Sequence, residues 1–267
     1  MKNQLKQENK PRKIAQLLGM VFLFLSSCSS DGLIEKTGQW DRIQYGDYLV
    51  ENTTWNVQAA RGEWTETIFY DTLKGSMGWE WDFPGETDAP GAYVIKSFPE
   101  IIFGRKPYAG YLSTTTLLPS ELTSVRLSIG YEYYAKATGI YNTSTDISFT
   151  DSKDPKEENI RAKMMIWFDH QDMPFFESEA LKQATIDGRE FKVFIDTTHT
   201  GPEGKWAFIA LLPDRFPSKG EINLNEFIDF FLSEGTLKPE WYLSSIEVGS
   251  EIASGEGKVT FKRFVVH

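Results

Sequence analysis

The sequence predicts an all-β sandwich with one amphipathic helix. Short segments rich in Val, Ile, Thr and aromatic residues recur along the chain, and Gly, Pro, Asn and Asp separate them, as in antiparallel β-proteins. Only residues 223–235 show the apolar spacing of a helix instead. The chain is also long enough for one large β domain, and no internal repeat or second domain is evident.

Nine segments carry the strand pattern. They are DYLVENTTW (47–55), AYVIKSFPEIIFG (92–104), SVRLSIGYEYYA (124–135), TDISFT (145–150), KMMIWFD (163–169), EFKVFID (190–196), KWAFIALL (205–212), WYLSSIEVGSEI (241–252) and KVTFKRFVV (258–266). Side chains alternate between the two faces of a strand, so residues 161–170 present two different faces. Lys163, Met165 and Trp167 share one of them, and Met164, Ile166 and Phe168 share the other. The second set is expected to face the core.

The segment NLNEFIDFFLSEG has the signals of a helix start and stop. Asn223 can act as the N-cap, Glu226 stands at the capping-box position, and Gly235 supplies the end. The apolar stripe that should pack on a sheet consists of Leu224, Phe227, Ile228 and Phe231. The charged segment DSKDPKEEN (151–159) predicts a loop without regular structure.

The N-terminus predicts a lipoprotein signal peptide over residues 1–27. Five basic residues precede the apolar run LLGMVFLFL (17–25), which is too short to span a bilayer. The run ends in LSSC, which resembles the lipobox of bacterial lipoproteins and marks Cys28 as the lipidated first residue of the mature chain. Residues 28–40 are then expected to be the lipidated Cys and a polar tether. The expected location is the bacterial cell envelope, anchored by lipid in the outer membrane on its periplasmic or surface face.

Charge and composition exclude some partners. The signal peptide holds five Lys or Arg and one Glu, which leaves 23 basic and 37 acidic residues and a net charge of about −14 in the mature chain. A nucleic-acid partner is therefore not expected. A neutral ligand is compatible with this balance, and 14% aromatic residues with eight Trp suggest surfaces that stack on sugar rings. Cys28 is the only cysteine, so an intrachain disulfide is impossible.

The sequence offers no metal, cofactor or nucleophile motif. The three histidines are scattered without ligand spacing, and no G-x-S-x-G elbow occurs. The stretch DHQD (169–172) could hold a hard cation, but two carboxylates at the end of a strand are more typical of a solvated turn. We therefore expect no metal and no cofactor.

Six segments carry a resemblance to one known family. They are VENTTWNV (50–57), GWEWDFPG (78–85), VIKSFPEIIFG (94–104), YNTSTDISF (141–149), KMMIWF (163–168) and YLSSIEVGSE (242–251). They resemble segments of glycoside hydrolase family 12, the endo-β-1,4-glucanases and xyloglucanases, in their residues and in their order. The expected helix also stands before the last of them, as in that family. The resemblance implies a concanavalin-like jelly-roll β-sandwich over residues 41–267. It also implies a β-glucan polysaccharide or oligosaccharide as the partner, bound by a monomer.

The resemblance also implies roles for individual residues. The general acid/base of the family falls on Glu251, its supporting Asp on Asp146, and its nucleophile position on Lys163. The residues that it implies for stacking on sugar rings are Trp55, Trp79, Trp81 and Trp167.

Lys163 departs from the family pattern in a way that affects the chemistry. A retaining glycosidase needs two carboxyl groups, one to attack the anomeric carbon and one to protonate the leaving oxygen. A lysine ammonium has no lone pair with which to attack, and it repels an oxocarbenium-like transition state. A cation close to Glu251 should also keep that carboxyl ionised and unable to donate a proton. The sequence thus predicts a β-glucan-recognition protein. It is expected to bind the same class of ligand as the enzymes of the family but to lack normal retaining hydrolysis.

Four alternatives stay open at this point. Glu157 or Glu158 could enter from the charged loop and replace the missing carboxylate, and Glu251 could work with Asp146 across a water in an inverting mechanism. The chain could be an active endo-β-1,4-glucanase or xyloglucanase in a different register, although strand parity argues against a shift by one residue. Finally, Lys163 could be a structural ion-pair partner in an envelope interaction protein that has no glycan ligand.

Overall fold

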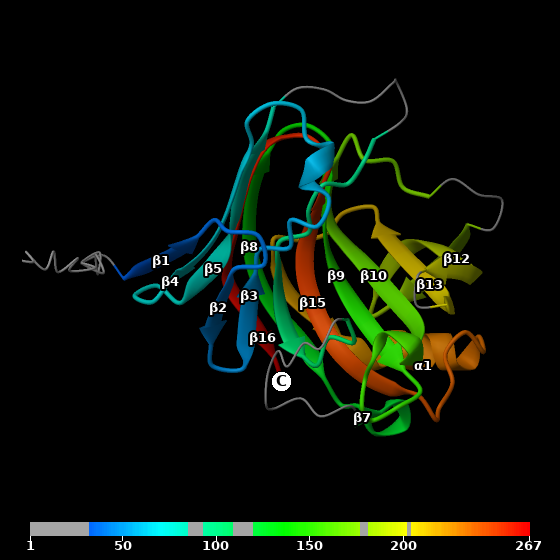
Figure 1. Cartoon of the computed structure of the whole chain (residues 1–267). Helices are drawn as coiled ribbons and strands as arrows, with labels where there is room; N and C mark the ends of the chain where they lie inside the picture. Colours follow the sequence, from blue (N-terminus) through cyan, green and yellow to red (C-terminus); the bar gives the residue numbers. More distant parts are fainter. Residues whose placement is uncertain (1–31, 85–92, 109–119, 177–180, 202–203) are drawn as a thin grey trace, which may run out of the picture. The chain divides into compact units, whose positions relative to one another are not determined.

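Two packed β-sheets and one helix make up the described part of the chain. The computed structural model describes residues 32–84, 93–108, 120–176, 181–201 and 204–267. Figure 1 shows β9, β10 and β15 in one layer and β5, β8 and β16 in the other. The expected signal peptide and Cys28 lie outside the described residues. Among those residues, no helix is long and apolar enough to cross a membrane.

The smaller sheet has six antiparallel strands. Their spatial order is β1 (Leu33–Lys36), β4 (Thr65–Asp71), β5 (Ser76–Phe83), β16 (Gly255–Val266), β8 (Ser128–Ala137) and β14 (Lys219–Asn223).

The larger sheet joins distant parts of the sequence. Its spatial order is β11 (Lys182–Ile186), β12 (Arg189–Gly201), β13 (Gly204–Pro213), β10 (Ile160–Gln171), β9 (Tyr141–Thr150), β15 (Tyr242–Ile252), β6 (Glu100–Gly104), β3 (Tyr48–Glu51) and β2 (Arg42–Tyr45), and β7 (Ser120–Glu121) pairs with β15. The β10–β13 pair is parallel, whereas the strand pairs from β10 through β9 and β15 to β6 are antiparallel. This order brings β9, β10 and β15, which carry most of the site, next to one another.

The alternation predicted for β10 is confirmed. Met164, Ile166 and Phe168 are buried in the main core between the sheets. On the opposite face, Met165 and Trp167 join Met173 in a second, smaller apolar cluster. The face that carries Lys163 is therefore the outer face of the larger sheet, away from the main core.

The predicted helix is confirmed as α1 (Leu224–Ser233), with the expected N-cap but a different capping-box partner. Asn223 Oδ1 accepts the backbone N–H of Asn225 at 3.2 Å, so Asn223 is the N-cap. Its own N–H donates to Asp187 Oδ2 at 3.2 Å, which takes the role expected of Glu226 in a capping box. Gly235 ends the helix with a φ of 72°. The four predicted apolar residues are its buried side chains.

The structure also corrects three local expectations. Residues 33–36 pair with β4 as strand β1, so the expectation of a tether is wrong for that stretch. The segments TETIFYD and SMGWEWDF form strands β4 and β5, which the nine predicted strands did not include. Short 3₁₀ turns occur at η1 (Val57–Ala59), η2 (Leu122–Ser124) and η3 (Glu157–Asn159), the last inside the predicted loop.

Candidate functional site

A cleft of about 880 Å³ lies on the outer face of the larger sheet. Its lining combines carboxyl groups, cations and aromatic rings. The charged residues among them are Asp146, Glu157, Glu247, Glu251, Arg42, Lys106 and Lys163, and the aromatic ones include Trp40, Trp55, Phe98 and Tyr108. The cleft therefore gathers residues from at least four separate segments of the chain.

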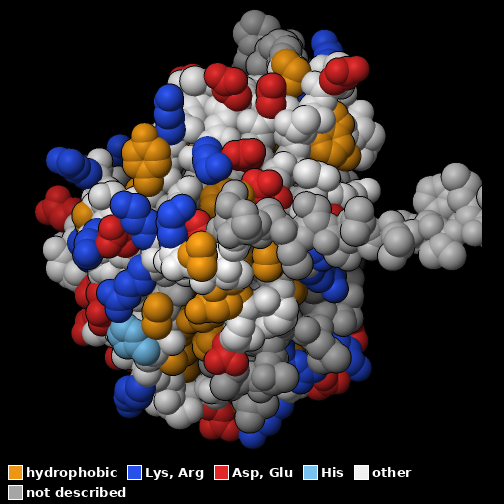
Figure 2. Space-filling model, turned by 90° about the vertical axis from the view of Figure 1, so that its left-hand side faces the viewer, with side chains coloured by type: hydrophobic (Ala, Val, Ile, Leu, Met, Phe, Trp, Pro, Cys, Tyr) orange, Lys and Arg blue, Asp and Glu red, His pale blue; other side chains and the backbone are white. Residues whose placement is uncertain are grey.

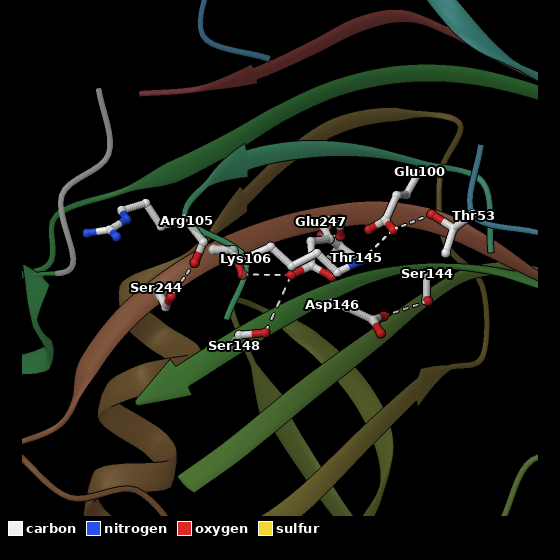
Figure 3. Close-up of polar contacts among 11 residues, drawn as sticks. Thr53, Glu100, Arg105, Lys106, Ser144, Thr145, Asp146, Ser148, Ser244 and Glu247 are labelled. Carbon is white, nitrogen blue, oxygen red and sulfur yellow. Dashed lines mark hydrogen bonds and ion pairs between the residues drawn. The ribbon is translucent and has the colours of Figure 1, made fainter. Parts of the chain in front are cut away.

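Asp146 lies at the centre of the cleft floor because of strand register. It stands on β9 directly opposite Glu247 on β15 and Met165 on β10. The Ser144 hydroxyl donates to Asp146 Oδ1 at 2.8 Å (Figure 3). Burial raises the pKa of Asp146 to about 7, and the negative charges of Glu251 and Glu247 act in the same direction, against the Lys163 cation. This carboxyl thus changes charge near neutral pH.

Glu251 lies four residues after Glu247 on β15, opposite Asn142 of β9. The Asn142 side-chain amide donates to Glu251 Oε2 at 2.5 Å, and the Glu251 backbone N–H donates back to Asn142 Oδ1 at 3.2 Å. Burial raises the pKa of Glu251, while the Asn142 hydrogen bond and the Lys163 cation lower it. The predicted effect of Lys163 has the right sign, but burial outweighs it, so the pKa of Glu251 lies above its ordinary value.

Lys163 lies beside these carboxyl groups and between two aromatic rings. Its ammonium is 4.1 Å from the ring centre of Tyr108 and 5.5 Å from that of Trp206, both within the range of a cation–π interaction. The strand partners of Lys163 are Ser148 on β9 and Phe208 on β13. The cation is therefore held by both charge and ring contacts at the cleft floor.

A second lysine, Lys106, organises a buried group of carboxyls that the sequence did not predict. Its ammonium lies 2.5 Å from Glu100 Oε1 and 3.5 Å from Glu247 Oε2 (Figure 3). The Thr53 hydroxyl also donates to Glu100 Oε1, at 3.0 Å, and the Ser245 hydroxyl donates to Glu247 at 2.6 Å. These contacts join β6 and β15 to the segments that follow β3 and β6, at the wall of the cleft.

The two carboxyls of this group carry different charges. Burial raises the pKa of Glu100 to about 8, so Glu100 holds a proton at neutral pH. Burial alone would raise the pKa of Glu247 as well, but the cations of Lys106 and Lys163 lower it. Among the described residues, Glu100 Oε2 has no hydrogen-bond donor. A proton on that oxygen makes it a donor, so that it is no longer a buried acceptor without a partner, and Glu100 then hydrogen bonds to ionised Glu247.

Of the four tryptophans expected to stack on sugars, only Trp55 lines the cleft. Its side chain is 48% exposed. Trp79 and Trp81 are buried in the main core, where the Trp79 indole N–H donates to Ser250 Oγ at 3.0 Å. Trp167 is buried in the second apolar cluster. The expectation for these three is wrong because β5 turns Trp79 and Trp81 into the main core, and because apolar side chains cover Trp167 on the outer face of β10.

Other cleft residues were missed or only partly predicted. Trp40, Tyr108 and His199 line the cleft, although no motif identified them. Of the two loop glutamates considered as substitutes for a nucleophile, Glu157 lines the cleft and Glu158 is not among the lining residues. Among the described residues, no group of three or more His, Cys, Asp or Glu side chains is arranged to hold a metal ion.

Comparisons with known proteins agree with this geometry. Endoglucanase S from Pectobacterium parmentieri is 27% identical over 258 residues, which cover 94% of this chain and 94% of that protein. A family 12 xyloglucanase from Bacillus licheniformis has the same fold, with a TM-score of 0.77 at 22% identity over 88% of this chain and 99% of that chain. The endoglucanase Cel12A from Rhodothermus marinus gives a TM-score of 0.71 at 21% identity over 87% and 97% of the two chains.

These likenesses confirm the predicted jelly-roll sandwich. The family model of glycosyl hydrolase family 12 matches residues 46–267, which is most of the chain and all of the cleft floor. The chain belongs to glycosyl hydrolase family 12.

Proposed function

We propose that this protein is a lipid-anchored β-glucan-binding protein of family 12 that lacks normal retaining hydrolysis. The observation that carries the proposal is the presence of Lys163 in one cleft with Glu251 and Asp146, below the exposed ring of Trp55. The cleft thus keeps an aromatic surface and hydrogen-bonding groups for a sugar chain. In the family's nucleophile position it holds a cation.

The environment of Lys163 supports a non-nucleophilic role. Asp146 and Glu247 both interact electrostatically with its ammonium, and the Tyr108 ring lies against it. Each of these contacts favours the charged form of the amine, which cannot attack an anomeric carbon. A fixed positive charge at this place also opposes the positive charge that develops on a sugar ring during glycoside cleavage.

Binding of a neutral glycan does not need the missing group. Trp55 and Trp40 offer partly exposed ring faces at the cleft, and sugar rings pack well on such faces. Asp146, Glu251 and Lys163 supply acceptors and donors for sugar hydroxyls. Xyloglucan or another β-1,4-glucan is the proposed ligand, because several relatives are named xyloglucan-specific endo-β-1,4-glucanases.

The proposed location follows from the sequence. Cys28 carries the lipid after removal of residues 1–27, and the domain is held at the cell envelope as a monomer. The variant Cys28→Ala should move the protein from the membrane fraction to the soluble fraction, because no helix among the described residues is long and apolar enough to cross a membrane. Retention of the variant in washed membranes would contradict this part of the proposal.

One specific observation favours a second candidate, an active endo-β-1,4-glucanase that uses a different carboxylate. Glu157 lines the same cleft as Glu251, and Asp146 titrates near neutral pH, as a general acid or base must. Either one could act with Glu251, in an inverting arrangement if the separation leaves room for a water. A third candidate, an envelope interaction protein without a glycan ligand, has no supporting observation in the cleft.

One experiment separates the three candidates. The soluble chain from residue 29 is run in native gels that contain xyloglucan or mixed-linkage glucan, and the same samples are assayed for new reducing ends. The proposal predicts retardation without reducing-end release. Release that is lost in Glu157→Gln or Asp146→Asn would establish the active enzyme instead, and absence of both signals on every β-glucan would favour the interaction protein.

A further inference from the structure

The mature chain has little free length between Cys28 and the folded domain. The Gly32 carbonyl accepts the Thr72 backbone N–H at 2.8 Å and the Thr72 hydroxyl at 2.9 Å, and Leu33 pairs with Asp71 in the sheet. The chain is therefore fixed to the β4–β5 turn from Gly32 onward. Four residue steps separate Cys28 from Gly32, and a fully extended chain spans at most about 14 Å over that length. A lipid on Cys28 would hold the β4–β5 turn within that distance of the bilayer.

Exposed apolar side chains gather at the same end of the domain. Leu73, at the tip of the β4–β5 turn, is 75% exposed, and it lies against Gly32, where a Cβ would be 2.6 Å from Leu73 Cγ. Leu33 and Ile34 on β1 are also exposed. Tyr45 is exposed as well and packs on Tyr70, the strand partner of Ile34, at 4.2 Å between ring centres. Leu33 and Ile34 point to opposite faces of this edge strand, so we call only Ile34, Tyr45 and Leu73 the exit patch.

The charge around the exit patch differs from that of the chain as a whole. The mature chain is strongly acidic, so most of its surface should be repelled by anionic lipid. At the exit patch, Lys74 forms a 2.8 Å ion pair with Asp71, and the two charges cancel. Figure 2 views the domain from the side on which β1 and β4 lie in Figure 1, and both charge signs are interspersed there with hydrophobic side chains. The tip of the β4–β5 turn therefore carries no net charge from this pair that would repel an anionic membrane.

We infer that the exit patch rests on the lipid bilayer, so that the domain lies against the membrane in one orientation and does not rotate on a flexible tether. The inference rests on the lipid anchor at Cys28 proposed above. Tethering to the bilayer gives the patch a high local concentration of lipid, so a small apolar contact is sufficient. The strand β1 is the element that enforces the orientation, because it turns the expected tether into part of the sheet.

Site-specific quenching tests the orientation. The full chain is produced with its signal peptide and reconstituted in phosphatidylethanolamine and phosphatidylglycerol vesicles that contain lipids with brominated acyl chains. Cys28 is the only natural cysteine and its sulfur would carry the lipid, so Leu73→Cys offers one labelling site for a fluorophore. The matched control is Asp229→Cys, an exposed position on α1, which lies at the far side of the domain from β1 (Figure 1).

The expected result is at least threefold stronger quenching at position 73 than at position 229. Equal quenching at both positions, or no quenching at either, in protein that floats with the vesicles would overturn the orientation and leave the anchor intact. Failure of the labelled chain to float with the vesicles would overturn the anchor, and the orientation with it. Adding Ile34→Ser to Leu73→Cys should reduce the quenching at position 73 without changing flotation.

Discussion

The ammonium of Lys163 lies 4.1 Å from the ring centre of Tyr108, at the floor of a cleft that also holds Glu251. A desolvated cation–π contact of this kind is worth about 2 kcal/mol. Lys163 thus contacts the Tyr108 ring and interacts electrostatically with Asp146 and Glu251. Its removal should change the charge state of those carboxyls more than the fold of the strand.

Replacement of Lys163 by an uncharged residue should raise the pKa of Asp146. The pKa of Asp146 is about 7 while the Lys163 cation lowers it, so Lys163→Met should move the midpoint above 7. The midpoint of Glu251 should rise as well, because the same cation lowers its pKa. Carboxyl ¹³C shifts followed by NMR across pH 4–9 measure both. An unchanged Asp146 midpoint would show that Lys163 does not act on this carboxyl.

Trp55→Ala should weaken glucan binding about tenfold or more, because an exposed ring in the cleft is lost without a change in the core. The control is Tyr134→Ala, which removes a similarly exposed ring from β8 in the other sheet. Affinity electrophoresis on xyloglucan measures both variants. Equal weakening by the two substitutions would mean that Trp55 has no special role in binding.

Lys106→Met should destabilise the domain by about 3–5 kcal/mol, because it leaves ionised Glu247 without its nearest cation and Glu100 without one of its hydrogen-bond donors, both of them buried. Lys74→Met removes an ion pair of similar length at an exposed turn, and its cost should be much smaller because water screens that pair. Urea unfolding at pH 7 compares the two. A small and equal loss of unfolding free energy in the two variants would mean that protonation of Glu100 and Glu247 is enough to compensate for the loss of Lys106.

Glu66 makes stability depend on pH in a predictable direction. Burial raises its pKa to about 8 from the usual 4.5, so the folded protein binds this proton more tightly than the unfolded chain. The resulting stabilisation is fully present below pH 4.5 and is lost as the pH rises to about 8. The free energy of unfolding of Glu66→Gln should therefore exceed that of the native protein at pH 8 by roughly a few kcal/mol, and the two should be similar at pH 4.

Thermal unfolding at the two pH values measures this difference. The Gln side chain can still accept the hydrogen bond that Ser97 donates to Glu66, which keeps the comparison clean. Glu80→Gln, on an exposed carboxylate of the neighbouring strand, is the control and should show no such pH dependence. A Glu66→Gln variant that gains nothing at pH 8 would place the pKa of Glu66 in its ordinary range.

Local patterns predicted the β10 faces and the helix, because alternation and the 3.6-residue period determine which side chains meet the core. The same patterns failed for Trp79 and Trp81. Their segment was not among the nine predicted strands and the two residues were expected to stack on sugars, whereas pairing with β4 and β16 makes the segment a central strand of the smaller sheet. Long-range pairing of this kind leaves no local signal.

The candidate site was predictable only in part for a related reason. Asp146, Lys163 and Glu251 followed from family motifs, and all three line the cleft. No motif gave a role to Lys106 or Glu100, and their contact depends on the segment that follows β6. The raised pKa of Glu251 depends on burial, which a sequence does not give, and that burial outweighs the lysine charge on which the sequence argument relied.

The account depends most on the presence of Lys163 and Glu251 in one cleft. Lys163→Glu supplies the second carboxyl group that a retaining glycosidase needs, and its negative charge should raise the pKa of Glu251 further. The gain is expected to be modest, since a misplacement of about 1 Å costs on the order of a hundredfold in rate.

The most direct measurement is therefore reducing-end release from xyloglucan and mixed-linkage glucan by the native chain, by Lys163→Glu and by Lys163→Glu with Glu251→Gln. The account predicts release by Lys163→Glu alone, with none from the native chain and none from the double variant. Native activity that Lys163→Glu abolishes would contradict it outright. A Lys163→Glu variant that folds, binds glucan and stays inert would show that Lys163 and Glu251 do not occupy the two catalytic positions.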